Sequence, residues 1–241
     1  MEPVKVVSIA AGLLCVVVAT TVPVLSAPPE TPEAQKHAAK GRELLASGDL
    51  PEAERELRQA VEMAPDDPEF LALLGVALGM QRKLQESDAY LEKALKLDPA
   101  DSVTRRNLSW IQFDLGELAP SKANLLRVLK EKPHDATATL LLGMVEEELH
   151  QFSSAVKLLT SVPEQVRQRP ESLAALARAY YYSGEQTKSR EILKELKSRT
   201  GPPESIFTAA QGQICRISKM PKPCFVRLPR VIPTRRSSGT L

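Results

Sequence analysis

The chain has 241 residues, enough for an ordinary buried core or for a stack of repeats without a single core. Leu, Ala, Glu, Lys and Arg dominate, and aromatic residues make up only 4%, a composition that favours helices and gives no predicted strand. The formal net charge of +2 excludes a strongly acidic or basic chain as a whole, but the charge is uneven. Residues 214–241 carry seven bases and no acid, which leaves 25 of the 32 basic residues against 30 acidic residues upstream.

The N-terminus resembles an export signal. Lys5 precedes an apolar run over 6–25, and the small residues Ser26 and Ala27 precede a proline-rich stretch. A basic start, an apolar run and small residues before a polar break predict a signal peptide over 1–27, cleaved after Ala27. The alternative is an uncleaved membrane anchor, because about 20 apolar residues cross a bilayer. Both readings predict an exported protein, periplasmic or anchored facing outside the cytoplasm, with 28–33 as a stiff linker.

An internal repeat of 34 residues dominates the rest of the chain. A leucine recurs at this spacing in five units, and small side chains recur four residues before it and in an earlier column. Glycines mark a turn in three units, and prolines end the first three units. The columns are Leu57, Leu91, Leu125, Leu159 and Leu193; Ala53, Ser87, Ser121, Ala155 and Ser189; Gly41, Gly75, Ser109, Gly143 and Ala177; Gly48, Gly116 and Gly184; Pro65, Pro99 and Pro133.

Each column has a direct physical reading. Leucines and small residues spaced by three and four place an apolar stripe on each of two helices per unit. Small residues let these two helices approach closely, glycine allows the tight turn between them, and proline ends the second helix. Such a helix-turn-helix unit cannot bury its own apolar face, so neighbouring units must stack. The sequence therefore predicts an all-α superhelical solenoid of tandem helix-turn-helix repeats.

These columns resemble the tetratricopeptide repeat family. The resemblance covers residues 34–203 and divides them into five units. The fourth unit departs from the pattern because Pro163 falls inside its second helix, which predicts that this helix ends early. In the first unit, His37 and Lys40 occupy places that are normally apolar, which suits an N-terminal cap. The units are 34–67, 68–101, 102–135, 136–169 and 170–203.

The pattern ends near residue 214. Residues 204–213 resemble a partial sixth first helix, and 214–241 form a basic tail that is expected to be disordered. The tail is either native or the product of a truncation or altered reading frame in a longer repeat protein. If the apolar N-terminus is removed, Cys215 and Cys224 remain, and an oxidising compartment permits a disulfide between them. Two unpaired thiols are the alternative.

No constellation of catalytic or metal-binding residues stands out. The histidines at 37, 134 and 150 lack metal-ligand spacing from one another and from cysteine. No glycine-rich phosphate loop follows a strand, and the run Glu146–Glu148 is typical of a solvated helix face. The sequence predicts a protein that is not an enzyme and needs no cofactor or metal.

The resemblance to tetratricopeptide repeats implies a partner site. In that family the first helices line a concave side that binds peptides or partner helices, so the partner is expected to be a protein. The family's clamp for a C-terminal carboxylate is not expected, because the first unit lacks its Lys and Asn. An apolar or amphipathic helix, or a peptide, fits better. The predicted partner-binding residues are Arg42, Val76, Met80, Arg106, Trp110, Phe113, Asp114, Met144, Glu147, Arg178 and Tyr181.

Trp110 and Phe113 are central to this site, since exposed aromatics with Arg and Met are typical of interaction hot spots. In the alternative interpretation, Trp110 only packs against a neighbouring first helix. The predicted function is a non-catalytic scaffold of the cell envelope. A second hypothesis is that the basic tail binds an anionic membrane surface, with nucleic acid made improbable by export. A third is an accessory or assembly subunit of a larger envelope complex.

Overall fold

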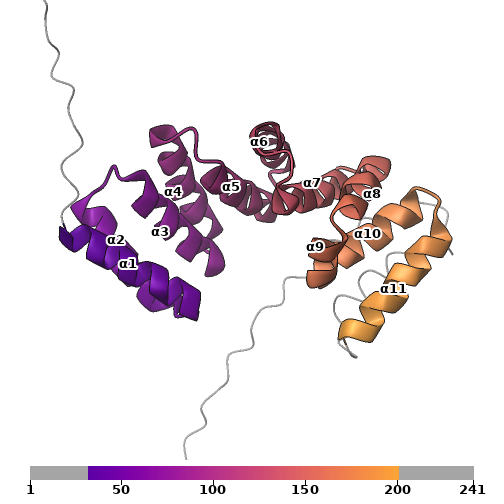
Figure 1. Cartoon of the computed structure of the whole chain (residues 1–241), viewed down its shortest axis with the longest axis horizontal. Coiled ribbons are helices and arrows are strands. Elements are labelled where there is room, and N and C mark those ends of the chain that lie inside the picture. Colours follow the sequence, from indigo (N-terminus) through magenta and orange to yellow (C-terminus); the bar gives the residue numbers. More distant parts are fainter. Residues whose placement is uncertain (1–31, 201–241) are drawn as a thin grey trace, which may run out of the picture.

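The computed structural model describes residues 32–200, and this part of the chain contains eleven α-helices and no strand. The helices follow one another as a row of hairpins (Figure 1), which confirms the predicted all-α solenoid. The first helices of the hairpins are α1 (Pro32–Ser47), α3 (Pro68–Met80), α5 (Ser102–Leu115), α7 (Ala136–Glu148) and α10 (Pro170–Tyr182). The second helices are α2 (Leu50–Met63), α4 (Leu84–Leu97), α6 (Leu118–Glu131), α8 (Phe152–Ser161) and α11 (Gln186–Thr200).

The helix starts follow the sequence period. The second helices begin at residues 50, 84, 118, 152 and 186, and the first helices from α3 onward begin at 68, 102, 136 and 170. Helix α1 is the exception, because it begins at Pro32, inside the stretch expected to be a linker. Proline is favourable in the first helical turn, where its missing N–H has no partner to lose.

The small-residue columns bring the two helices of a hairpin into contact. A methyl group added to Gly75 would lie 2.7 Å from Cγ of Leu91, and one added to Gly143 would lie 2.8 Å from Cγ of Leu159. The leucine column is fully buried at Leu91, Leu159 and their counterparts at 57 and 125. Tight packing of this kind explains the small residues in the first helices, because a larger side chain would force the helices apart.

The serines of the other small column add a hydrogen bond that the column pattern did not predict. The hydroxyl of Ser87 donates to the carbonyl of Gly75 at 2.7 Å, and Ser121 donates to the carbonyl of Ser109 at 2.7 Å. Ser189 repeats the bond with Ala177 at 2.8 Å. A serine here therefore stabilises the hairpin as well as leaving room for close approach.

The turns of all five hairpins share one backbone conformation. Gly48, Gly116 and Gly184 have φ of 85°, 81° and 90°, and the equivalent residues Arg82 and His150 have φ of 63° and 61°. Positive φ suits glycine but strains a residue with a side chain. The turn is therefore kept by the fold even where the sequence does not favour it.

The fourth hairpin is interrupted where the proline predicts it. Helix α8 ends at Ser161, and a short helix, α9 (Pro163–Gln168), begins at Pro163 and leads to α10. Val166 of α9 is buried in the cluster that also contains Leu173 of α10. The early end of α8 is confirmed, and α9 begins where the second helices of the other repeats continue without a break.

The way the hairpins stack sets the curvature of the array. Each second helix packs against its own first helix, and α2, α4, α6 and α8 also pack against the first helix of the next repeat. Neighbouring first helices also approach one another along their backbones. The second helices of residues 32–200 do not, and they meet through long side chains, as in the ion pair of Arg58 of α2 with Glu86 of α4 at 2.9 Å. The first helices therefore form the closely spaced inner layer, and we call their exposed surface the concave face (Figure 1).

Several predictions fall outside the part of the chain that the structure describes. These are the signal or anchor over 1–27, the partial helix over 204–213, the tail over 214–241 and the pair Cys215 and Cys224. Among the helices between residues 32 and 200, none combines the length and apolar character needed to cross a membrane.

Candidate functional site

The concave face is built on helices whose starts are fixed by aspartates. Asp67 accepts hydrogen bonds from the amides of Glu69 and Phe70, Asp101 from that of Val103, and Asp135 from that of Ala138. These aspartates recur every 34 residues and cap α3, α5 and α7. This column was missed in the sequence, although the same alignment of units contains it.

The polar residues predicted to bind a partner lie in ion pairs between successive first helices. Arg106 of α5 contacts Asp135 at the start of α7 at 2.6 Å. Arg178 of α10 donates two hydrogen bonds to Glu147 of α7, one of them from Nε at 2.8 Å. Two further pairs are Arg42 with Glu69, and Arg82 with Asp114.

These ion pairs change the electrostatics of the face. Burial alone would raise the pKa of Asp135, but the Ala138 amide and Arg106 outweigh burial and hold that pKa below its usual value. Glu148 shows the opposite effect: burial and the neighbouring Glu147 raise its pKa. The predicted polar residues thus hold neighbouring repeats in register, and their charges are largely matched within the chain.

Two of the residues that were predicted to bind a partner, and were therefore expected to be exposed, are buried. Met144 is 8% exposed and packs with Leu140 and Tyr180, and Glu147 is 5% exposed beneath Arg178. The expectation of exposure was wrong for both, because α10 leans against α7 and covers the end of this helix. Contact of Met144 and Glu147 with a partner stays a prediction, and their burial does not support it.

Trp110 is half-buried and packs against the cluster of α6 and α7 residues that includes Leu141. Cζ of Arg169, the residue before α10, lies 4.5 Å from the centre of the Trp110 ring. Arg169 occupies the place of the capping aspartates and makes no side-chain cap to α10. The cation therefore covers part of the indole, as expected for a cation–π contact. This geometry favours the packing interpretation of Trp110.

The other predicted residues divide between packing and exposure. Phe113 is half-buried and contacts the two clusters on either side of α7. Tyr181 is half-buried and makes an edge contact with Tyr182, which stacks on Phe152 at 4.6 Å. Met80 is 53% exposed, and Val76 is half-buried between α3 and α5.

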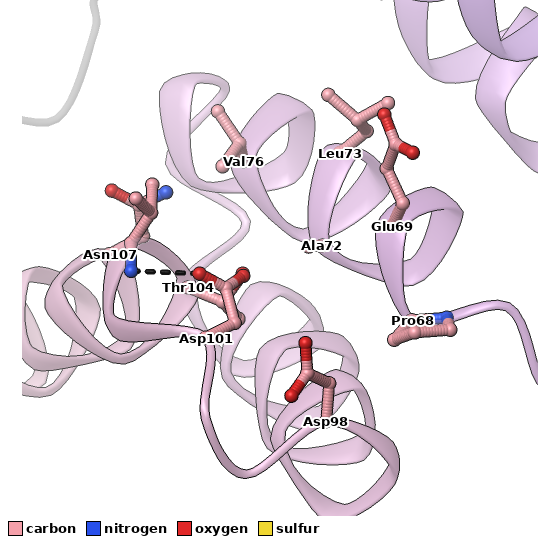
Figure 2. Close-up of a pocket in the computed structure, with 10 residues that line it drawn as sticks. Pro68, Glu69, Ala72, Leu73, Val76, Asp98, Asp101, Thr104 and Asn107 are labelled. Atoms are coloured by element: carbon pink, nitrogen blue, oxygen red, sulfur yellow. Dashed lines mark hydrogen bonds between the residues drawn. The ribbon is translucent and has the colours of Figure 1, made fainter.

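A pocket of about 270 Å³ lies between α3 and α5 on the concave face (Figure 2). We call it the α3–α5 pocket. Its apolar wall contains Val76, which was predicted, and Val103, which is 46% exposed. Apart from Val76, the residues that line the pocket were not among those predicted to bind a partner. The remaining lining residues are Pro68, Glu69, Ala72, Leu73, Asp98, Asp101, Thr104 and Asn107.

The carboxylate of Asp101 at this pocket stays charged at neutral pH. Burial would raise its pKa, but the Thr104 hydroxyl and the amides of Thr104 and Val103 outweigh burial and lower the pKa. Asp98 is exposed at the same end of the pocket. The pocket thus combines an apolar floor with fixed negative charge. In residues 32–200 no group of three or more acidic, histidine or cysteine side chains is arranged to hold a metal ion.

Comparison with known proteins matches part of the chain to a repeat family. Residues 38–102 match the family model described as tetratricopeptide repeat. No match was found among curated protein sequences. The solved structure of MamA from Desulfovibrio magneticus RS-1, residue 41 to the end, is 19% identical, with a TM-score of 0.61 over 72% of this chain and 99% of that one.

Two further solved structures share the fold. PilW, a type IV pilus biogenesis factor, is 20% identical, with a TM-score of 0.61 over 73% of this chain and 82% of its own. YrrB, described as a protein of the same repeat type with an unusual peptide-binding site, is 17% identical, with a TM-score of 0.58 over 74% of this chain and 92% of its own. At these identities the likeness establishes the fold and leaves the function open.

Proposed function

We propose that the chain is a non-catalytic scaffold that binds a peptide or helix of a partner protein on the concave face, in keeping with the match of residues 38–102 to the tetratricopeptide repeat. The observation that carries the proposal is the α3–α5 pocket, which leaves apolar surface open between two first helices. Elsewhere on this face, ion pairs and Arg169 already cover much of the predicted site.

The location of the protein is part of the proposal. The apolar segment over 1–27 supports export, either as a cleaved signal or as an anchor in the membrane. Similarity to PilW, a pilus biogenesis factor, agrees with a role in the cell envelope. We therefore place the scaffold outside the cytoplasm, where its partner would be another envelope protein.

The predicted residues have different roles in this proposal. Val76, Val103 and Met80 are expected to contact the partner directly, because they are apolar and open to solvent in whole or in part. Arg42, Arg106, Asp114 and Arg178 are expected to act mainly by holding successive first helices together. Trp110 and Phe113 are expected to pack against the buried residues beneath the concave face.

A capture experiment with matched variants tests this function. The full chain, Val103→Glu, Trp110→Ala and Leu126→Glu would each be immobilised and exposed to an envelope extract, with bound proteins identified by mass spectrometry. Leu126 is the control, since it is 51% exposed but lies on α6 rather than on the concave face. We expect one partner to bind the native chain and the control and to be lost with Val103→Glu.

Trp110→Ala distinguishes the two interpretations of the tryptophan. Loss of capture with unchanged helical content, measured by circular dichroism, would restore Trp110 as a contact residue. If Val103→Glu captures the same proteins as the native chain, the pocket is not the binding site and the proposal fails.

A further inference from the structure

The α3–α5 pocket has a one-sided charge. Three of its ten lining residues are carboxylates, Glu69, Asp98 and Asp101, and none is Lys, Arg or His. Glu69 is matched by Arg42, whereas Asp98 is exposed and Asp101 is held in its charged form by the hydrogen bonds of the α5 cap. Ala72, Leu73, Val76 and Val103 form the apolar part. The complementary ligand is therefore an apolar side chain flanked by cations.

The chain contains such a sequence outside the described residues. Residues 225–233 read Phe-Val-Arg-Leu-Pro-Arg-Val-Ile-Pro, with Arg227 and Arg230 among apolar residues and no acid. Pro229 and Pro233 disfavour a helix and favour an extended segment. A sequence that mixes apolar and basic residues in this way is complementary to an apolar pocket with acidic residues at one end.

The chain is also long enough for this segment to reach the pocket. Packed helices lie about 8–10 Å apart, so the three steps from α10 through α7 and α5 to α3 span roughly 30 Å. The α11 helix ends at Thr200, 27 positions before Arg227. A random-coil estimate for a chain of that length gives a root-mean-square end-to-end distance of about 5–6 Å times the square root of the residue number, again roughly 30 Å.

We infer that residues 225–233 dock in the α3–α5 pocket of the same chain, with an apolar residue on the pocket floor and Arg227 and Arg230 facing Asp98 and Asp101. The inference rests on the proposed function, because residues 225–233 would compete with the partner protein for the same pocket. Tethering supplies a high effective concentration, so a weak contact suffices to fill the pocket until a partner displaces it.

Disulfide trapping in the full chain tests the docking. Cys224 directly precedes the segment, and Cys15→Ser with Cys215→Ser leaves it as the single native thiol. Val103→Cys places a second thiol at the pocket, and Leu126→Cys places one at a similarly exposed site on α6. Both proteins would be equilibrated in a glutathione redox buffer, and the fraction of intrachain disulfide measured by mass spectrometry.

We expect the effective concentration of the two thiols to be about tenfold higher with Val103→Cys than with Leu126→Cys. Adding Arg227→Glu and Arg230→Glu, or raising the salt from 0.05 to about 0.5 M, should remove most of that difference. Equal trapping at both sites would overturn the inference. So would disulfide-linked dimers in place of intrachain bonds, since the occupant would then be a second copy.

The trapping result is independent of partner capture. If trapping fails while capture succeeds, the internal competitor is wrong and the proposed function stands. If trapping succeeds while capture fails, the pocket serves the chain's own segment and the scaffold function loses its support.

Discussion

Nζ of Lys83 lies 2.6 Å from a carboxylate oxygen of Glu54, joining the first and second repeats. One repeat later, the same two positions hold Glu117 and Asp88, so an attractive pair is replaced by two acids. Burial, Glu92 and Glu117 raise the pKa of Asp88, and its Oδ1 is buried with no hydrogen-bond partner in the part of the chain that the structure describes. The junction of the second and third repeats is therefore electrostatically unfavourable.

Glu117→Lys should stabilise the array by about 0.5–1 kcal/mol, because it restores the pair seen one repeat earlier. Urea denaturation followed by circular dichroism measures the change. Glu117→Gln serves as the control and should give a smaller gain, since it removes the repulsion without adding an attraction. A Glu117→Lys protein no more stable than the native chain would show that the two positions do not interact.

His150→Gly should raise the free energy of unfolding by about 1 kcal/mol, because His150 has a φ of 61° where three other repeats have glycine. The same denaturation experiment applies. Gly116→Ala is the reciprocal change and should cost a similar amount. A loss of stability on His150→Gly would mean that contact of its ring with Phe152, 5.6 Å away, outweighs the backbone strain.

Ser121→Ala should lower the free energy of unfolding by about 1 kcal/mol, since it removes a buried hydrogen bond to the Ser109 carbonyl without leaving a cavity. Ser153→Ala, at an exposed site on α8, is the control and should be neutral. Thermal unfolding of both variants decides the matter. Equal stability of the Ser121→Ala and native proteins would reduce the serine column to a requirement for small size.

The ionisation of Glu56 makes the stability of the folded protein depend on pH. Hydrogen bonds from Lys40 and His37 lower its pKa to about 2 from 4.5. A carboxylate with a lowered pKa in the folded state stabilises fully above pH 4.5, and this contribution is lost as the pH falls toward 2. Glu56→Gln should therefore be less stable than the native protein at pH 6, and the difference should shrink in this acid range.

Denaturation midpoints at pH 6, 4 and 3 measure the effect, with Glu62→Gln, exposed on the same helix, as the control. If the difference in stability between Glu56→Gln and the native protein is the same at all three pH values, Glu56 does not make the stability depend on pH. The result also bears on His37 and Lys40, which the sequence suggested were a polar cap. They bind the buried Glu56 of α2 instead.

The fold could be predicted because helix pairing depends on columns of residue types at fixed spacing. Leu91 and Gly75 contact each other in the way that their columns predict, and Pro163 ends α8 as expected. The turn at Arg82 was also identifiable from its place in the column, although the residue itself does not favour positive φ.

The site could be predicted only in part. Removing the packing columns leaves the residues of one helix face, but it does not show which of them meet a neighbouring helix. Glu147 and Arg178 lie 31 positions apart and form an ion pair because α7 and α10 are in contact. Such contacts depend on the angle between repeats, which no single helix encodes. The Asp67, Asp101 and Asp135 column was available in the sequence and would have pointed to the start of α5.

The backbones of the second helices in residues 32–200 lie apart, and only side chains such as Arg58 and Glu86 bridge them, which gives the array the mechanics of a spring. Changing the spacing of the outer helices disturbs no close backbone packing between them, so bending is resisted mainly by salt-sensitive ion pairs that cross from repeat to repeat. Small rotations at each junction add along the row. The array can thereby adjust its curvature to partners of different width, and the ionic strength of the solution sets its stiffness.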